Sequence, residues 1–465
     1  MAVDVLLVPL IVTAACLLPI GALARPLAVC SGLIVAGRAA AALWLGLGGG
    51  PSEALVWAGP LGATFSLGSD GFSAVLLVLT GVLFAAGAAA SGGVAAPRAF
   101  VALWSLLQLA ASGVLLARDL ILFFAFWEAM LVPLALLLWL WGGPDRRAAT
   151  YRFLLYTMAG SALLLVGIVV LGGGAHTFAL AGLVGYRLAE PSQVVLALLF
   201  LGAFAVKLPL FPFHGWLPRA YASAPVPVAI VLSGVIAKTA VYGIARICLP
   251  LFPLGMADLA PLLAALATVG ALYGAILAGR QDDTRGLIAY SSLSHLNLIG
   301  LAAVVGSGDA LRAALVASVS HGLVVAALFL LTGALAARTG STAYGSGGLA
   351  ARAPVLATFT TIAVIAAIGV PGTSGFAGEV LILSATYARF PGAALLATTV
   401  VIGAAVYGLG FLRRAFFGPA AARGSDLGWR ERALVLPLLA LVLAVGVAPR
   451  VISDVPLGPP AERAQ

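Results

Sequence analysis

Charged residues are scarce in this sequence. They make up 9% of its 465 residues, whereas hydrophobic residues make up 62%. A soluble globular domain carries about a quarter charged residues, so the composition excludes a soluble domain of useful size and indicates a polytopic membrane protein. The net charge of +9 comes from arginines between the apolar runs, which is typical of membrane topology rather than of nucleic-acid binding.

Cysteine is also rare, and its positions exclude several classes of site. Cys16, Cys30 and Cys248 lie in apolar runs without a C-x-x-C pair. We therefore expect no iron–sulfur cluster, no zinc site and no disulfide framework. No strand is evident, and no phosphate-binding glycine motif follows one.

Long apolar runs are abundant instead. A membrane-spanning helix needs about 20 apolar residues, and the sequence contains fourteen such runs. They cover approximately residues 3–23, 26–46, 72–92, 97–116, 119–142, 150–172, 193–215, 225–249, 258–279, 285–305, 310–336, 354–388, 392–416 and 432–450. The predicted fold class is an all-α polytopic membrane protein with about 14 transmembrane helices.

The arginines predict an orientation. When the loops are assigned alternately to the two sides, one side receives fifteen arginines and the other seven. Cytoplasmic loops carry the excess of basic residues, so the richer side is predicted to be cytoplasmic. Both termini are then expected on the outer side.

Lysine occurs only twice, and both lysines lie in apolar segments. Lys207 precedes Pro209 and Pro212 in a segment that continues through His214. Proline interrupts a helix, and a broken helix is tolerated in a membrane only where protein or a water-filled cavity surrounds it. The sequence predicts a functional site at this break. The alternative is that Lys207 and Lys238 extend to the lipid headgroups.

A second interruption contains Gly369, Pro371, Gly372 and Gly375 and ends at Glu379. The two breaks fall in the seventh and twelfth predicted helices, and breaks at corresponding positions indicate an inverted-repeat transporter. Two inverted five-helix repeats are predicted, helices 4–8 and 9–13. The chain is predicted to divide into four parts. Residues 1–96 form the first three helices, residues 97–250 the first repeat, residues 258–418 the second repeat, and residues 432–465 the last helix and the tail. The alternative is that two common Gly/Pro kinks match by chance.

Apart from Arg38 in the second run, which has no assigned role, six ionisable side chains are singled out inside the apolar runs, where an isolated charge costs several kcal/mol. They are Glu128, Lys207, Lys238, His295, His321 and Glu379. We expect Glu128 and Lys207 to form an ion pair whose geometry decides whether the lysine holds its proton. Lys238, the histidines and Glu379 would continue a proton relay. The alternative for the histidines is a helix–helix hydrogen bond.

Two further residues near helix ends have predicted roles. His214, at the end of the broken helix, either guards proton uptake or caps freed backbone groups. Asp283 is expected to cap the tenth helix.

Several motifs together carry a resemblance to a known family. They lie at residues 124–133, 206–218, 232–243, 287–295, 320–323, 327–333 and 369–379. They resemble the antiporter-like membrane subunits of respiratory complex I, from about Asp70 to Pro419. Within that family, the acidic residue Glu379 resembles the subunit M type, because subunits L and N usually carry lysine there. After the first proline-rich motif the family usually has Asp, Ala-His and an acidic residue, where this chain has Arg219, Tyr221 and Ser223.

The resemblance implies fourteen helices in two inverted repeats and a proton path along a central polar axis. In that path Glu128 and Lys207 form the switch, Lys238, His295 and His321 connect, and Glu379 is the terminal acid. It implies a translocase subunit of an NADH–quinone oxidoreductase that couples quinone reduction to proton pumping.

The resemblance also implies cofactors and partners. It places no cofactor in this chain, and NADH, FMN, Fe–S clusters and quinone are expected in other subunits. The expected partners are L- and N-like antiporter subunits and a small K-like subunit in a bacterial inner membrane. Two alternatives remain: a subunit of a multisubunit cation/proton antiporter, and a membrane subunit of an energy-converting hydrogenase-type complex.

Overall fold

The computed structural model of the chain describes residues 2–46, 55–58, 62–344, 347–418 and 425–457. It contains two compact units. Unit 1 comprises residues 1–208, 235–263 and 454–465, and unit 2 comprises residues 209–234 and 264–453.

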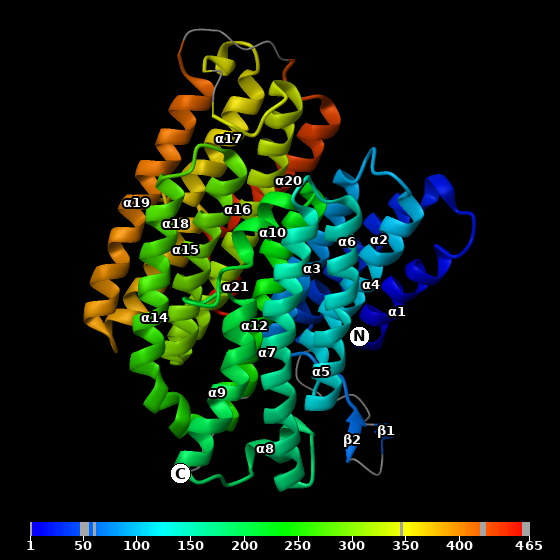
Figure 1. The fold of residues 1–465 in the computed structure, drawn as a ribbon, viewed down its shortest axis with the longest axis vertical. Helices are drawn as coiled ribbons and strands as arrows, with labels where there is room; N and C mark the ends of the chain where they lie inside the picture. The colour runs from blue at the N-terminus through cyan, green and yellow to red at the C-terminus, as the bar shows by residue number, and fades with distance from the viewer. Residues whose placement is uncertain (1, 47–54, 59–61, 345–346, 419–424, 458–465) are drawn as a thin grey trace. The chain divides into compact units, whose positions relative to one another are not determined.

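Helices build nearly all of both units (Figure 1). The first nine are α1 Ala2–Ala15, α2 Ala24–Trp44, α3 Gly71–Ala90, α4 Pro97–Leu116, α5 Leu120–Ala129, α6 Leu131–Trp141, α7 Arg146–Ala175, α8 Leu180–Val184 and α9 Glu190–Lys207. The next five are α10 Leu217–Ser223, α11 Val226–Val231, α12 Ala237–Gly243, α13 Leu249–Leu251 and α14 Pro253–Gly279. The last seven are α15 Thr284–Val305, α16 Gly308–Thr339, α17 Pro354–Ala367, α18 Ser374–Tyr387, α19 Pro391–Phe416, α20 Trp429–Val447 and α21 Arg450–Ser453.

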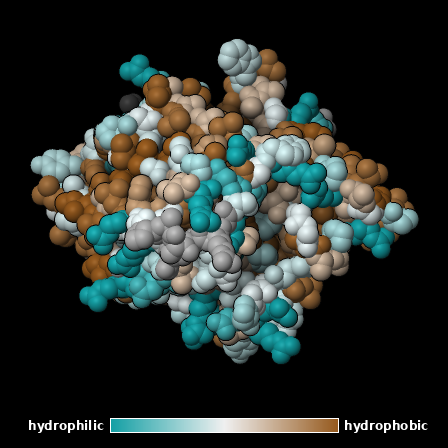
Figure 2. Space-filling model, turned by 90° about the horizontal axis from the view of Figure 1, so that it is seen from above, coloured by the Kyte–Doolittle hydropathy of each residue, from teal (hydrophilic) through white to brown (hydrophobic). Residues whose placement is uncertain are grey.

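Eleven helical segments in the described part of the chain are long and apolar enough to cross a membrane. Each coincides with one of the fourteen predicted runs. The other three runs contain α1, the pair α17 and α18, and α20. Hydrophobic side chains, brown in Figure 2, cover broad areas of the surface, and exposed residues such as Ile276 and Ile402 belong to long apolar helices. Such surfaces suit contact with lipid or with apolar partner helices.

Three local features differ from the sequence expectation. The first run was expected to be helical to residue 23, but α1 ends at Ala15, four residues before Pro19. The fifth run is divided at Met130 into α5 and α6, because Pro133 has no N–H to donate to the carbonyl of Ala129. The expectation of no strand is wrong: β1 Leu55–Ala58 and β2 Ala63–Phe65 pair as an antiparallel hairpin.

Both predicted helix breaks are confirmed. In the seventh run α9 ends at Lys207, and residues 208–216 form turns before α10 begins. In the twelfth run α17 ends at Ala367 and α18 begins at Ser374. Gly369 and Gly372 lie between them with φ of 71° and 91°. Residues other than glycine rarely adopt such positive φ angles. Gly375 lies in the first turn of α18 rather than in the linker.

The eighth run is one unbroken helix of unusual winding. Its residues 226–251 include π-helical turns at Leu232–Ile236 and Ile244–Cys248, and α12 lies between them. Turns of this kind are rare and occur frequently at functional sites. Lys238 lies in α12.

Small residues allow close packing in unit 1. A Cβ atom added to Gly32 in α2 would lie 2.6 Å from the backbone nitrogen of Ala85 in α3, and one added to Gly81 would lie 2.5 Å from that of Ala36. Backbones that approach this closely are typical of helix packing in membranes. The long helices α7 and α9 also run side by side in this unit (Figure 1).

Candidate functional site

Lys207 is the last residue of α9 and is buried, with 6% of its surface exposed. Its Nζ atom lies 3.6 Å from the centre of the Trp127 ring. The indole Nε1 donates a hydrogen bond to Ser161 Oγ at 3.2 Å, which fixes the ring. A desolvated cation over an indole face gains about 2 kcal/mol, so Trp127 stabilises the ammonium form of this lysine.

Glu128 follows Trp127 in α5 and is half-buried. In the described part of the chain, no carboxylate oxygen lies within 4 Å of the Lys207 ammonium, but the charge of Glu128 acts on it through space. Glu128 lies two residues before Met130, where α5 and α6 are divided. The expected ion pair between Glu128 and Lys207 therefore stays a prediction.

Lys238 is the most deeply buried charged side chain of the predicted relay, with 2% exposure. It borders a small cavity together with Leu76, Thr80 and Leu115. All of these residues belong to unit 1, as do Glu128 and Lys207. The first three residues of the predicted relay thus lie in one compact unit.

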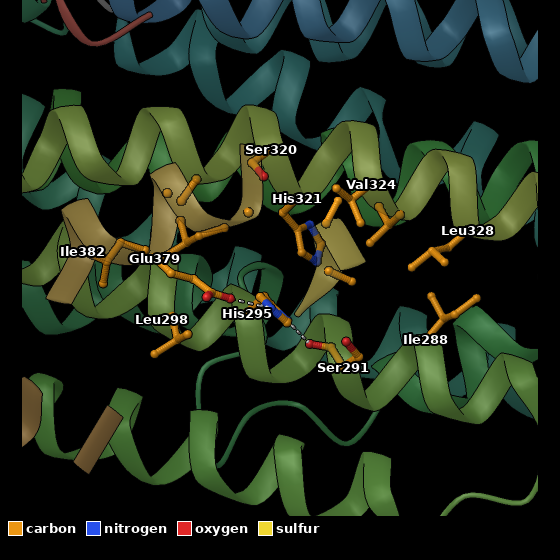
Figure 3. A pocket seen from close by; sticks show the side chains of 17 residues that line it. Ile288, Ser291, His295, Leu298, Ser320, His321, Val324, Leu328, Glu379 and Ile382 are labelled. Carbon is orange, nitrogen blue, oxygen red and sulfur yellow. Dashed lines mark hydrogen bonds and ion pairs between the residues drawn. The ribbon is translucent and has the colours of Figure 1, made fainter. Parts of the chain in front are cut away.

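The other three residues lie in unit 2, where His295 contacts Glu379 (Figure 3). The imidazole Nε2 of His295, in α15, lies 3.3 Å from Oε1 of Glu379, in α18. The Nδ1 atom lies 2.8 Å from the carbonyl oxygen of Ser291. Since a carbonyl oxygen only accepts, Nδ1 carries a hydrogen and donates it.

The geometry of the His295–Glu379 pair determines which atoms can exchange a proton. With Nδ1 committed to the carbonyl of Ser291, only Nε2 of His295 can gain or lose a proton. One proton is therefore shared with Glu379, as imidazolium and carboxylate or as imidazole and carboxylic acid. A pair of this kind can receive a proton on one partner and release it from the other.

His321, in α16, is the third member of the group. Its ring centre lies 6.1 Å from that of His295, and both rings border a cavity of about 40 Å³ with Ser320 and Glu379 (Figure 3). A water molecule needs about 10–15 Å³ measured in this way, so the cavity has room for about two or three water molecules. Water there would link His321 to the His295–Glu379 pair.

The glycine break positions Glu379. A Cβ atom on Gly369 would collide with the Glu379 carboxylate. A glycine at this position therefore serves two purposes, the positive φ of the turn and the space for the carboxylate. Gly372, in the same turn, has open space around its Cα.

Two residues that contact each other, Ser291 and Tyr407, were missed by sequence reasoning. The hydroxyls of Ser291 and Tyr407 lie 3.0 Å apart, and Ser291 is the residue whose carbonyl fixes His295. Tyr407 is in α19, more than 100 residues away, and a tyrosine in an apolar helix gives no signal of this contact.

A second group that sequence reasoning missed lies in unit 1. Asp70 contacts two arginines, with 2.9 Å to Nε of Arg246 and 3.6 Å to Nη2 of Arg118. Asp70 is 4% exposed and caps α3. The residues lie in three separate parts of the sequence, so no local pattern joins them.

The remaining predicted residues surround the breaks. His214 is half-buried and packs on Phe211 and Tyr273, at ring-centre distances of 5.6 and 5.0 Å. Its Nδ1 is buried and has no hydrogen-bond partner in the described part of the chain. The predicted cap of α15 is confirmed, because Asp283 accepts the N–H of Gly286 at 2.8 Å. Within the described ranges, no cluster of three or more His, Cys, Asp or Glu residues is suited to a metal ion.

Residues 117–405 match the family model described as NADH:quinone oxidoreductase/Mrp antiporter, TM. The chain belongs to this family. Among its relatives, NADH-quinone oxidoreductase subunit M of Pseudomonas aeruginosa is 37% identical over 418 residues, which are 86% of this chain and 82% of the relative.

Solved structures support the same assignment. A chain of respiratory complex I from Thermus thermophilus with bound NADH matches with a TM-score of 0.91 and 32% identity, over 97% of both chains. A chain of the Mrp complex from a Dietzia species matches with a TM-score of 0.88 and 23% identity, over 98% of this chain and 96% of that chain. At that identity the second match shows a common fold only. As a member of the oxidoreductase/antiporter family with many apolar spans, the protein is a multi-pass membrane protein.

Proposed function

We propose that this protein is a proton-translocating membrane subunit, of the subunit M type, of an NADH–quinone oxidoreductase. The observation that carries the proposal is the His295–Glu379 pair beside a cavity with room for water. Ionisable groups buried in a membrane are costly, and those that occur commonly mark ion or proton pathways. The similarity to subunit M over most of the chain supports the choice of complex.

In the proposed mechanism, Lys207 holds a proton against the Trp127 ring while the charge of Glu128 acts on it. A change in the position of Glu128 weakens that hold, and the proton moves toward Lys238. His321, His295 and Glu379 take it up and release it in the second part of the relay. We propose that the two groups act in series, as the two halves of a pair of inverted five-helix repeats, helices 4–8 and 9–13 of fourteen.

The energy for this movement comes from the rest of the complex. Moving one charge against the membrane potential costs about 2.3 kcal/mol per 100 mV, and the reduction of quinone elsewhere supplies it. We propose that NADH, FMN, Fe–S clusters and quinone bind to other subunits. We also propose that L- and N-like subunits and a K-like subunit adjoin this chain in a bacterial inner membrane, with both termini outside.

Replacing Glu379 by glutamine tests the proposal. The amide keeps the shape of the side chain but cannot take up the proton that Nε2 of His295 shares with the carboxylate. Proton transfer by a positioned group typically contributes 10²–10⁴-fold, so we expect NADH-driven acidification of membrane vesicles to fall by at least about tenfold. Quinone reduction should fall with it, because the two processes are coupled.

Glu190→Gln is the matched control, since Glu190 is exposed at the start of α9. It should leave both rates unchanged. Normal acidification by an assembled Glu379→Gln complex would contradict the proposal. Activity that depends on added sodium ions instead would favour the antiporter alternative.

A further inference from the structure

Three polar residues lie along one helix of unit 1 and lead from Lys238 to the surface. Lys238, Tyr242 and Arg246 follow one another at intervals of four residues. Residues four apart lie on the same face of a helix. Lys238 and Tyr242 are buried, with 2% and 1% of their surface exposed, whereas 12% of the Arg246 side chain is exposed. The face therefore leads from the buried lysine toward solvent.

The hydroxyl of Tyr242 is the unexplained group in this series. It is buried, and no atom in the described part of the chain forms a hydrogen bond with it. The Tyr242 ring centre lies 6.5 Å from that of Phe72, and the guanidinium carbon of Arg246 lies 5.1 Å from the centre of the same Phe72 ring. A buried hydroxyl without a partner is costly, and ordered water commonly supplies the missing hydrogen bonds. Water there would connect the hydroxyl to the charged groups beside it.

The charged cluster forms the outer end of the series. Asp70 has both carboxylate oxygens engaged: Oδ1 accepts the N–H of Ser73 at 2.8 Å, and Oδ2 contacts Arg246 at 2.9 Å. Arg118 contacts the same Oδ2 at 3.6 Å, and 26% of its side chain is exposed. Its backbone is held at both ends, since its N–H bonds to the carbonyl of Ser66 and its carbonyl accepts the N–H of Leu180.

We propose that Lys238, Tyr242 and the Asp70–Arg246–Arg118 cluster form a proton-release branch of unit 1, with the Asp70–Arg246 ion pair as its gate. The branch opens where Arg118 is exposed, on the side that the arginine distribution assigns to the outside. It rests on the proposed function, because Lys238 belongs to the proposed relay. It adds a route by which this unit discharges a proton directly.

The steps of the branch move only a proton. The Lys238 ammonium gives a proton through water to the oxygen of Tyr242, whose own hydroxyl proton passes to Oδ2 of Asp70. Arg246 must leave Oδ2 for this transfer, and when it returns the proton is released to the water around Arg118. The two positive charges oppose protons that approach from outside, as arginines do in other pores. The ion pair therefore allows release and hinders return.

Tyr242→Phe is the sharpest test, because it removes an oxygen that has no hydrogen-bond partner among the described residues and leaves the ring in place. In vesicles that contain the assembled complex, acidification and quinone reduction should fall by about tenfold, since a positioned proton carrier is lost. The solvent isotope effect on quinone reduction should rise, because proton transfer becomes limiting. A merely structural role of Tyr242 would not change that isotope effect.

Tyr221→Phe is the matched control, since Tyr221 is equally buried and lies in unit 2. It should change neither rate nor isotope effect. Asp70→Asn is the second variant: asparagine still caps α3 but lacks the charge, so pumping should fall while the amount of assembled complex is kept. Normal rates in both Tyr242→Phe and Asp70→Asn would overturn the branch.

Arg246→Gln tests the gate separately. Without this positive charge, the pH gradient should decay several times faster after NADH is exhausted, and an unchanged decay would overturn the gate. Lys207→Met separates the branch from the function on which it rests. If Lys207→Met stops pumping but the Tyr242 and Asp70 variants do not, the function stands and the branch fails. If Lys207→Met has no effect, both fail.

Discussion

At the scale of single residues, the protein combines buried ionisable side chains with neighbours that hold them in place. Lys207 lies against the Trp127 ring, and His295 is fixed by the carbonyl of Ser291. In each case the neighbour restricts one side of the group and leaves the other free to exchange a proton. Preorganised neighbours of this kind reduce the rearrangement that each transfer requires.

Gly369→Ala tests how closely Glu379 depends on its surroundings. The new methyl group would collide with the carboxylate and would also strain a turn whose φ is 71°. Such strain costs about 1–3 kcal/mol. We expect the assembled variant to lose most of its NADH-driven acidification, because Glu379 must leave His295.

Gly372→Ala separates the two effects. Gly372 has a φ of 91° in the same turn, but nothing lies near its missing side chain. This variant should carry the strain and keep most of the pumping. Equal pumping by the two alanine variants would show that the space for Glu379 is unimportant.

At this scale the buried ionisable side chains can be predicted from the sequence, but their contacts cannot. Glu128, Lys207, Lys238, His295, His321 and Glu379 stand out because charge is rare in apolar runs. The contact of Ser291 with Tyr407 joins residues far apart in the chain. The cluster around Asp70 joins three separate segments. Packing decides such contacts, and no local pattern encodes them.

At the scale of elements, the interruptions of the helices position the site. The breaks after Lys207 and Ala367 follow from proline and glycine in apolar runs, so the sequence predicts both. The π-helical turns on either side of α12 were not predicted, because the first contains one glycine, Gly234, without a proline, and the second contains neither residue. The hairpin of β1 and β2 was also missed, because four- and three-residue strands show too little alternation.

One aspartate holds the start of α17, the first half of the second broken helix. Asp426 accepts the N–H groups of Val355 and Leu356 at 3.0 Å each, and its segment is tied to α16 by Arg338. Burial raises the pKa of Asp426, but these N–H groups, that of Leu427 and the charge of Arg432 outweigh burial and hold the pKa below the ordinary 3.8. The carboxylate is thus favoured in the folded state.

Asp426→Ala should loosen the start of α17. The loss of a helix cap costs about 0.5–2 kcal/mol, so hydrogen exchange in the first turn of α17 should accelerate in the solubilised complex at pH 7. A lowered folded-state pKa gives stabilisation that is complete above the unfolded value and is lost as the pH falls through the folded value. The difference between wild type and variant should therefore narrow below about pH 4.

Asp426→Asn serves as the control, because asparagine keeps an acceptor for the cap. Its exchange should lie between those of wild type and Asp426→Ala. Identical exchange in all three proteins at pH 7, or a difference that persists unchanged at low pH, would contradict this account of Asp426.

At the scale of the whole molecule, each compact unit contains three of the six predicted relay residues. Unit 1 contains the end of α9, and unit 2 contains the turn between α17 and α18. Because the chain belongs to the oxidoreductase/antiporter family, we interpret this arrangement as a transport site. In the proposed function, the buried groups carry protons in series, and Lys207 is the group that holds and yields the proton in unit 1.

Lys207→Met in the assembled complex tests that claim most directly. Methionine keeps the length and apolar body of the side chain but has no proton to hold. NADH-driven quinone reduction and vesicle acidification are measured together, with the exposed residue Arg219 replaced by methionine as the control. We predict that both rates fall by at least about tenfold in Lys207→Met and stay unchanged in Arg219→Met. Unchanged electron transfer and unchanged pumping in Lys207→Met would contradict the account.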